Sequence, residues 1–425
     1  MGIKIEQVKF ISRASVAAFG AYFCMYAFRK PFAVATFENL TFLGIDYKIL
    51  LVIAQVLGYM LSKFIGIKVI SELQAKQRFV YLVSLIGLSE VALILFGWVA
   101  KPYNIFFMFI NGLPLGMIWG IVFSYLEGRK YTEILGVLLC TSFIVSSGVV
   151  KSVGLAVMSG WGISQFWMPA VTGALFMLPL LFFAWALETI PPPTQEDKIL
   201  RVERVPIKQK ERLAVLKQFA LPLVTLIVFY TLLTAFRDLR DNFARELWDS
   251  LGYAGAISVY SSSETAVAVL VLIILASVHK IKNNLKALLT YHGILLMGTF
   301  AIGSSTFLLQ AGFLDPFYWM VISGFGLYTC YVPFNALFFD RFIAAFRING
   351  NAGFLIYLAD AFGYLGSMGV LLYKNFGLSS ISWLRLFING AYVLAILGTL
   401  SVVISYFNLR RKHSKTHFNA LAYEN

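Results

Sequence analysis

Long apolar runs, separated by short charged stretches, constrain the fold of this chain more than any other feature of its sequence. Each run has about the 20 residues that a helix needs to cross the hydrocarbon core of a bilayer. Inside lipid every backbone polar group needs a partner within the protein, and a helix supplies these partners within one segment. Charged residues make up 13% of the chain, whereas a soluble domain has about 25%. The sequence therefore predicts an all-α polytopic membrane protein.

The apolar runs fall into two groups of six, which predicts twelve transmembrane helices in two six-helix bundles. The one long hydrophilic stretch separates the two groups and carries a run of prolines followed by alternating charges. We therefore predict an N-terminal bundle over 1–187, a cytoplasmic linker over 188–217, a C-terminal bundle over 218–409 and a basic cytoplasmic tail over 410–425. The predicted spans are Ala14–Phe37, Tyr47–Ile67, Phe79–Val99, Tyr103–Leu126, Ile134–Met158, Phe166–Leu187, Phe219–Leu239, Tyr253–Val278, Leu285–Leu309, Pro316–Phe339, Asn351–Tyr373 and Trp383–Phe407.

Lysine and arginine concentrate in every second loop between the predicted spans. Cytoplasmic loops carry such an excess, so we expect both termini and the linker on the cytoplasmic side of the plasma membrane, the inner membrane of a bacterium. An anionic inner leaflet explains the net charge of +14, so the expected partner is the lipid bilayer and not a nucleic acid. The cysteines lack metal-ligand spacing and no enzyme motif is present, so we predict no catalytic residue, metal or cofactor. We expect a monomer.

Ionisable residues inside the predicted spans identify a candidate substrate site, because each costs about 2.5–3.5 kcal/mol on membrane-insertion scales. Arg29 follows Arg13 by sixteen residues, about 24 Å along a helix, which places it too deep for the membrane surface. Arg237 follows Lys217 by twenty residues, at a similar place in the second bundle. Transporters with repeated halves bind substrate where the halves meet. The two arginines therefore predict a site for a small divalent anion, because guanidinium is a bidentate donor to phosphate and carboxylate.

Each arginine also has a structural interpretation that leaves no site. Arg29 would then extend outward to the membrane surface, as long basic side chains do. Arg237 would be neutralised by Asp241, one turn along the same helix face. Arg240 is a rival to Arg237 as the anion ligand of this helix.

Further polar residues in the spans extend the candidate site. Tyrosine hydroxyls near the arginines are candidate donors to an oxyanion, lysines raise the local potential, and buried carboxylates are candidates for coupling or gating. An alternative role for Glu264 and Asp360 is a structural ion pair with a lysine. Glycines at helical spacing, Gly112, Gly116 and Gly120, and then Gly363, Gly366 and Gly369, predict close helix packing. The complete set is Arg29, Lys30, Tyr26, Tyr59, Lys63, Lys151, Tyr230, Arg237 and Arg240 for substrate binding, and Glu264, Asp360 and Asp241 for coupling or gating.

Several of these residues belong to strings that resemble motifs of a known family. Residues 26–33 read Tyr-Ala-Phe-Arg-Lys-Pro-Phe-Ala, which is similar to the Y-x-x-R-K-N-F-A motif of the first helix in organophosphate:phosphate antiporters. Those proteins are major facilitator superfamily carriers of glycerol 3-phosphate and hexose phosphates. Residues 58–65 resemble the family's G-x-x-S-K-F motif of the second helix. Residues 116–119 resemble its G-M-G-W motif, and residues 352–354 with 362–366 resemble its A-G-F and F-G-Y-L-G motifs.

The resemblance implies a major facilitator-type fold that works by alternating access, with a central phosphate site formed by one arginine from each half. By position these arginines are Arg29 and Arg237, and Lys63 matches the lysine of the second helix. The chain departs from the family pattern in three places. It has no histidine in the fifth helix, no aspartate in the loop after the second helix, and the string Arg-Asp-Leu-Arg-Asp over 237–241 in place of a lone arginine.

Together these observations predict a secondary active transporter of a small organic anion. The expected cargo is a phosphorylated metabolite, moved in exchange for phosphate. Two alternatives stay open at this point: a proton-coupled carboxylate symporter, and a membrane sensor that binds a phosphorylated ligand without transporting it.

Overall fold

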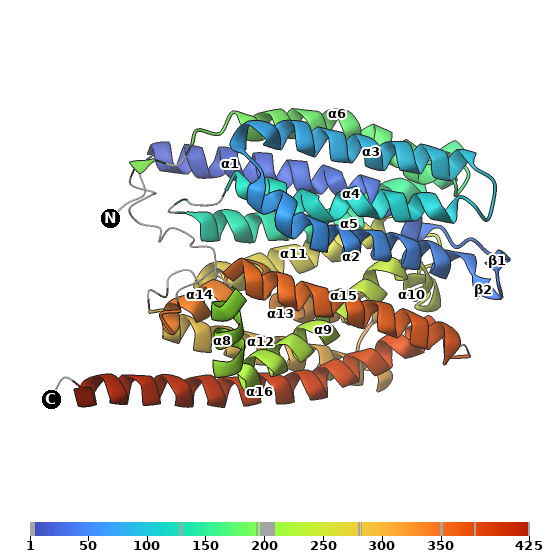
Figure 1. Cartoon of the computed structure of the whole chain (residues 1–425). Coiled ribbons are helices and arrows are strands. Elements are labelled where there is room, and N and C mark those ends of the chain that lie inside the picture. The colour runs from blue at the N-terminus through green and yellow to red at the C-terminus, as the bar shows by residue number, and fades with distance from the viewer. Residues whose placement is uncertain are drawn as a thin grey trace. The chain divides into compact units, whose positions relative to one another are not determined.

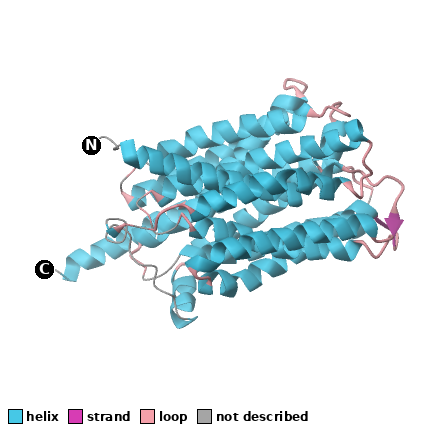
Figure 2. Ribbon diagram, turned by 90° about the horizontal axis from the view of Figure 1, so that it is seen from above, coloured by secondary structure: helices cyan, strands magenta, loops and turns pink. Residues whose placement is uncertain are grey.

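A computed structural model describes residues 5–126, 129, 131–192, 194–195, 209–278, 281, 283–348, 352–377 and 380–423. Helices form almost all of its secondary structure, and the strands form one small antiparallel hairpin, as Figure 2 shows. In the hairpin, β1 (Thr41–Phe42) pairs with β2 (Ile45–Asp46). The helices are α1 (Ile5–Met25), α2 (Tyr47–Glu72), α3 (Arg78–Trp98), α4 (Ile105–Ser124), α5 (Thr132–Trp161), α6 (Met168–Glu188), α8 (Gln209–Gln218), α9 (Ala220–Asn242), α10 (Ala244–Ser250), α11 (Ser258–Val278), α12 (Asn284–Gln310), α13 (Pro316–Ala336), α14 (Phe338–Ala345), α15 (Ala352–Phe376) and α16 (Trp383–Tyr423), with short 3₁₀ turns η1 (Tyr26–Phe28), η2 (Pro31–Val34) and η3 (Ala75–Gln77).

Each predicted span overlaps at least one of these helices. Among the described residues, ten helices are long and apolar enough to cross a membrane. The pair α13 and α14 is bent by 49° and makes an eleventh span if it is counted as one. Helix α1 is not among these, and its first half carries Lys9 and Arg13. The prediction of an all-α, multi-pass membrane fold is confirmed.

The helix ends differ from the prediction in three informative places. The first predicted span, Ala14–Phe37, is not one helix: α1 ends at Met25 and the 3₁₀ turns η1 and η2 follow. The span predicted from Tyr253 begins five residues later, at Ser258. Helix α16 continues to Tyr423, well past the predicted end at Phe407, because helix-forming residues continue into the basic tail.

The helices pack into two compact units. Unit 1 comprises residues 1–202, 238–272 and 368–384, and unit 2 comprises 203–237, 273–367 and 385–425. In unit 1, helices α1, α3, α4 and α6 lie side by side (Figure 1). The division into bundles over 1–187 and 218–409 stays a prediction, as do the linker and the tail as separate parts.

Glycines bring helices close together within each unit, as the sequence predicts. A Cβ atom at Gly112 would collide with the backbone oxygen of Gln55, and one at Gly116 would lie 2.7 Å from Cβ of Ser62. These positions allow α4 to lie directly on the backbone of α2. In unit 2, a Cβ at Gly363 would lie 2.7 Å from the hydroxyl of Thr234, so α15 approaches α9 in the same way. Gly369 has no such neighbour within 4 Å.

Candidate substrate site

The chain leaves helical geometry at the residues that were predicted to bind an anion. Helix α1 ends at Met25, and Arg29 and Lys30 lie between the two 3₁₀ turns. Pro31 opens the second turn, and it has no backbone N–H to continue the hydrogen-bond ladder of α1. The break places two adjacent cationic side chains inside unit 1, where Arg29 is 5% and Lys30 is 2% exposed.

Amide side chains from α2 and α4 hold this break. A broken helix leaves carbonyl groups without their usual partners, and a buried carbonyl without a partner is costly. Asn111 Nδ2 donates to the backbone oxygen of Phe28 over 3.0 Å, and Gln55 Nε2 donates to the backbone oxygen of Arg29 over 3.0 Å. Gln55 Nε2 also donates to Asn111 Oδ1 over 2.8 Å, and Asn111 Nδ2 to the hydroxyl of Ser89 over 2.6 Å. The carbonyl groups of Phe28 and Arg29 at the break therefore both have hydrogen-bond donors.

Arg29 packs on an aromatic ring in the interior of unit 1. Its guanidinium carbon lies 3.8 Å from the ring centroid of Tyr59, and Nζ of Lys63 lies 5.3 Å from the same centroid. Such contacts attract a cation to the ring face. This position contradicts the alternative in which Arg29 extends outward to the membrane surface. It also brings together three of the predicted site residues, Arg29, Tyr59 and Lys63. Tyr26 is also buried, one turn before Arg29.

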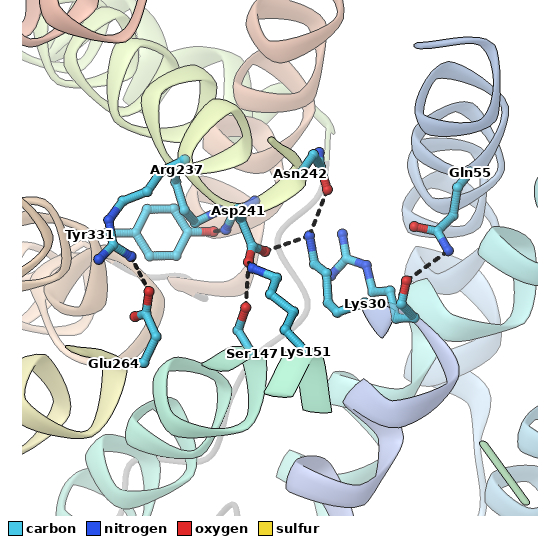
Figure 3. Close-up of polar contacts among 11 residues, drawn as sticks. Lys30, Gln55, Ser147, Lys151, Arg237, Asp241, Asn242, Glu264 and Tyr331 are labelled. Atoms are coloured by element: carbon cyan, nitrogen blue, oxygen red, sulfur yellow. Dashed lines mark hydrogen bonds and ion pairs between the residues drawn. The ribbon is translucent and has the colours of Figure 1, made fainter. Parts of the chain in front are cut away.

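A second cluster surrounds the carboxylate of Asp241 (Figure 3). Nζ of Lys30 lies 2.5 Å from Oδ2 of Asp241, and it also donates to Asn242 Oδ1 over 3.0 Å. Lys151 and the hydroxyl of Ser147 both contact Oδ1 of Asp241. One carboxylate thus contacts two buried lysines, which come from the helix-one break and from α5. The ion pairs of Asp241 are formed with Lys30 and Lys151. This contradicts the structural alternative in which Asp241 neutralises Arg237.

Arg240 and Glu264 form a buried ion pair between α9 and α11. The side chain of Arg240 is 3% exposed and that of Glu264 is 10% exposed. Glu264 therefore has an arginine as its partner, where the structural alternative expected a lysine. The choice between Arg237 and Arg240 as the anion ligand stays a prediction.

The remaining predicted residues form an aromatic cluster in unit 2. Arg237 donates a hydrogen bond to the hydroxyl of Tyr331, and its guanidinium carbon lies 4.5 Å from that ring and 5.9 Å from the ring of Tyr364. Tyr230 stacks on Tyr331 with 5.2 Å between the centroids. The hydroxyl of Tyr230 donates to Asp360 Oδ1 over 2.6 Å. The structure thus brings together three predicted residues, Tyr230, Arg237 and Asp360.

Several residues of these clusters were not predicted from the sequence, because they are neutral and the burial-cost argument applies mainly to ionisable groups. A search for neutral amides within apolar runs would have found Gln55 and Asn111. Tyr331 stands among many tyrosines and gives no separate signal in the sequence. Within the described part of the chain, no three His, Cys, Asp or Glu side chains are arranged to hold a metal ion. The joint action of Arg29 and Arg237, which belong to different units, stays a prediction.

Comparisons with known proteins give a family and a fold. The sequence model of a family of unknown function (DUF5690) matches residues 31–412. No curated protein matches the sequence. A solved structure of a D-xylose–proton symporter matches with a TM-score of 0.63 and 14% identity, covering 93% of this chain and 96% of the symporter.

Two further solved structures of membrane transporters also match the fold of this chain. A bacterial homologue of the human drug peptide transporters PepT1 and PepT2 matches with a TM-score of 0.62 and 12% identity, covering 95% of this chain and 99% of that one. The nucleoside transporter NupG matches with a TM-score of 0.56 and 16% identity, covering 93% and 98%. At these identities the likeness concerns the fold alone. The fold is that of major facilitator-type membrane transporters.

Proposed function

Since the chain belongs to DUF5690, a family of unknown function, we propose a function from its own residues: it is a secondary active transporter that moves a small organic anion by alternating access. The cargo that these residues fit best is a phosphorylated metabolite, exchanged for phosphate. The orientation that goes with this proposal has both termini in the cytoplasm, as the distribution of lysine and arginine indicates. The protein acts as a monomer in a plasma membrane.

The observation that carries the proposal is the break in the first helix at Arg29 and Lys30. Secondary transporters typically build their substrate sites from interrupted membrane helices near the midplane. Here the interruption places two cations in the bundle interior and fixes their backbone with Gln55 and Asn111. Buried cations at membrane depth mark ion or substrate pathways. A helix with a purely structural role would gain nothing from breaking its backbone hydrogen bonds and burying two charges.

The charges around the break favour an anion with two negative charges. Asp241 contacts Lys30 and Lys151, and Asp238, which is 3% exposed, interacts electrostatically with Lys30. Counted together, the two clusters in unit 1 contain four cationic residues and two carboxylates, an excess of two positive charges before Arg237 is considered. An arriving anion would compete with Asp241 for the lysines. These cationic residues are Arg29, Lys30, Lys63 and Lys151.

The cluster at Asp360 favours a second candidate, proton-coupled symport of a carboxylate. Asp360 is 6% exposed and accepts a hydrogen bond from Tyr230, whose ring stacks on the partner of Arg237. A buried carboxylate near a substrate arginine is the kind of group that takes up a proton during transport. This candidate differs from phosphate exchange in that it needs a proton gradient and no phosphate inside the vesicle.

The test is uptake of labelled phosphate into proteoliposomes that are preloaded with phosphate. We expect exchange by the wild type and a loss of about 100-fold or more for Arg29→Ala, because a charge-assisted contact contributes about 1.5–3 kcal/mol and the bidentate geometry adds to it. Arg29→Lys should fail as well, since an ammonium does not reproduce bidentate binding. Arg245→Gln is the matched control: Arg245 lies in α10 and pairs with Asp249, so exchange should persist.

Unchanged exchange in Arg29→Lys would contradict the role of Arg29. Absence of exchange by well-folded wild-type protein would contradict phosphate antiport. Uptake of a labelled carboxylate driven by an imposed proton gradient then decides whether the second candidate holds.

A further inference from the structure

A pocket of about 330 Å³ opens in unit 1 where α3 begins and where α4 and α6 end. The ends of these helices are the level at which a bilayer changes from hydrocarbon to headgroups. Its polar lining is strongly basic and includes Lys76, Arg78, Arg129, Tyr125 and Glu188. The pocket contains none of the residues that we assign to the transported anion.

Arg78 is the residue that most needs a ligand. Its guanidinium carbon lies 5.2 Å from the ring centroid of Tyr125, and its Nε is buried without a hydrogen-bond partner. Among the residues that the structure describes, it forms no ion pair. A partly buried guanidinium with an unsatisfied donor is costly, because water no longer replaces the missing acceptor.

The neighbouring groups hold the pocket in shape. Arg129 is 5% exposed and donates to the backbone oxygens of Pro191, over 2.5 Å, and Tyr125, over 3.2 Å. These two carbonyls fix the position of the guanidinium. Glu188 accepts the hydroxyl of Tyr125 over 2.6 Å. Three cationic side chains therefore share the pocket with one carboxylate, and the net charge of the lining is +2.

We propose that this pocket binds a phosphate group. Two guanidinium groups and one ammonium around a small cavity match the charge and the tetrahedral oxygens of phosphate, and arginine binds such oxygens with two parallel hydrogen bonds. A water molecule occupies about 30 Å³, so the cavity holds a phosphate group and several waters. The phosphate comes either from the headgroup of an anionic phospholipid or from a soluble molecule. Both sources reach the end of a transmembrane bundle.

The experiment measures the thermal unfolding of the purified full-length chain with two probes. One probe is inorganic phosphate in detergent, compared with chloride at the same ionic strength. The other is phosphatidylglycerol in nanodiscs, compared with phosphatidylcholine. Both are applied to wild type and to Arg29→Gln, because the proposed transport site also binds phosphate and must be removed from the signal.

In the Arg29→Gln protein we expect phosphate, phosphatidylglycerol or both to raise the unfolding temperature. Adding Arg78→Gln should raise the half-saturating concentration of the active probe by about tenfold, which corresponds to about 1.4 kcal/mol. Lys76→Gln is a second variant with little risk to folding, because Lys76 is exposed, and it should show a smaller effect in the same direction. Arg410→Gln removes an exposed charge outside the pocket and should change nothing.

A response to phosphatidylglycerol alone identifies a lipid headgroup as the source, and a response to inorganic phosphate alone identifies a soluble one. Either supports the site. No response in the Arg29→Gln protein overturns the proposal, while leaving the transport proposal untouched. The proposal is also overturned if Arg410→Gln weakens the response as much as Arg78→Gln does. The response would then come from general charge screening and not from the pocket.

Discussion

The ammonium group of Lys30 lies 2.5 Å from Oδ2 of Asp241, and both side chains are buried. Lys151 contacts the other oxygen of the same carboxylate. The two lysines therefore share one ion-pair partner, which comes from α9. Removing it leaves two buried ammonium groups without an ion-pair partner among the described residues, whereas removing one lysine leaves a complete pair.

Asp241→Asn should lower the free energy of unfolding by about 3–5 kcal/mol, the usual cost of breaking a buried ion pair from one side. The measurement is thermal or denaturant unfolding of the purified protein. Asp249→Asn is the control, because its partner Arg245 is 21% exposed and such pairs contribute about 0–1 kcal/mol. Phosphate should stabilise Asp241→Asn more than the wild type, since an anion then replaces the lost carboxylate. Equal losses in the two variants would contradict the assignment.

Substitutions of Tyr59 separate the role of its ring from that of its hydroxyl. The ring supports the guanidinium of Arg29 at 3.8 Å, and a cation–π contact contributes about 0.5–2 kcal/mol. Tyr59→Phe keeps the ring, so phosphate exchange should stay within about twofold of wild type. Tyr59→Leu removes the ring and should reduce exchange by roughly 2- to 30-fold. A loss in Tyr59→Phe as large as in Tyr59→Leu would show that the hydroxyl itself binds the anion.

Gly112→Ala tests the close approach of α2 and α4. The added methyl group would collide with the backbone oxygen of Gln55, which belongs to the same helix pair that holds the break. Overpacking of this kind costs about 1–3 kcal/mol, so the unfolding temperature should fall. Gly87→Ala is the matched control in α3, where nothing lies within 4 Å, and there alanine should be neutral or stabilising. Equal behaviour of the two variants would refute the packing role.

Glu90 and Glu264 are both buried carboxyl groups, but we expect their substitution by glutamine to change the unfolding temperature in different ways. Oε2 of Glu90 has no hydrogen-bond partner and, among the described residues, the side chain forms no ion pair. A charged carboxylate without a partner is destabilising there, so Glu90→Gln should leave the unfolding temperature unchanged or raise it. Glu264→Gln breaks the ion pair with Arg240 and should lower it. Unfolding curves of the two variants, measured side by side, decide the matter.

The sequence predicted the helices well because each apolar run is also a membrane-crossing segment, and no tertiary contact is needed to recognise it. It failed at the first span, where Pro31 and the adjacent Arg29 and Lys30 already signalled an interruption. A proline next to charged residues inside an apolar run predicts a helix interruption, even where the mean hydropathy predicts a continuous span.

The candidate site was predicted as a set of residues and not as a set of pairs. Burial cost identifies Lys30, Lys151 and Asp241 one by one, because each ionisable group in a span needs a reason to be there. Which carboxylate contacts which lysine depends on helix packing between segments that are distant in the sequence. The periodicity of one helix contains no such information, so the nearest sequence neighbour, Asp241 for Arg237, was a natural but incorrect partner.

The amide bonds at the helix break have a mechanical consequence. A continuous helix would position Arg29 and Lys30 by its own backbone. Here the carbonyls of Phe28 and Arg29 are attached instead to Asn111 on α4 and Gln55 on α2. The backbone that carries Arg29 and Lys30 is therefore positioned by α2 and α4, and a displacement of either helix moves both cations.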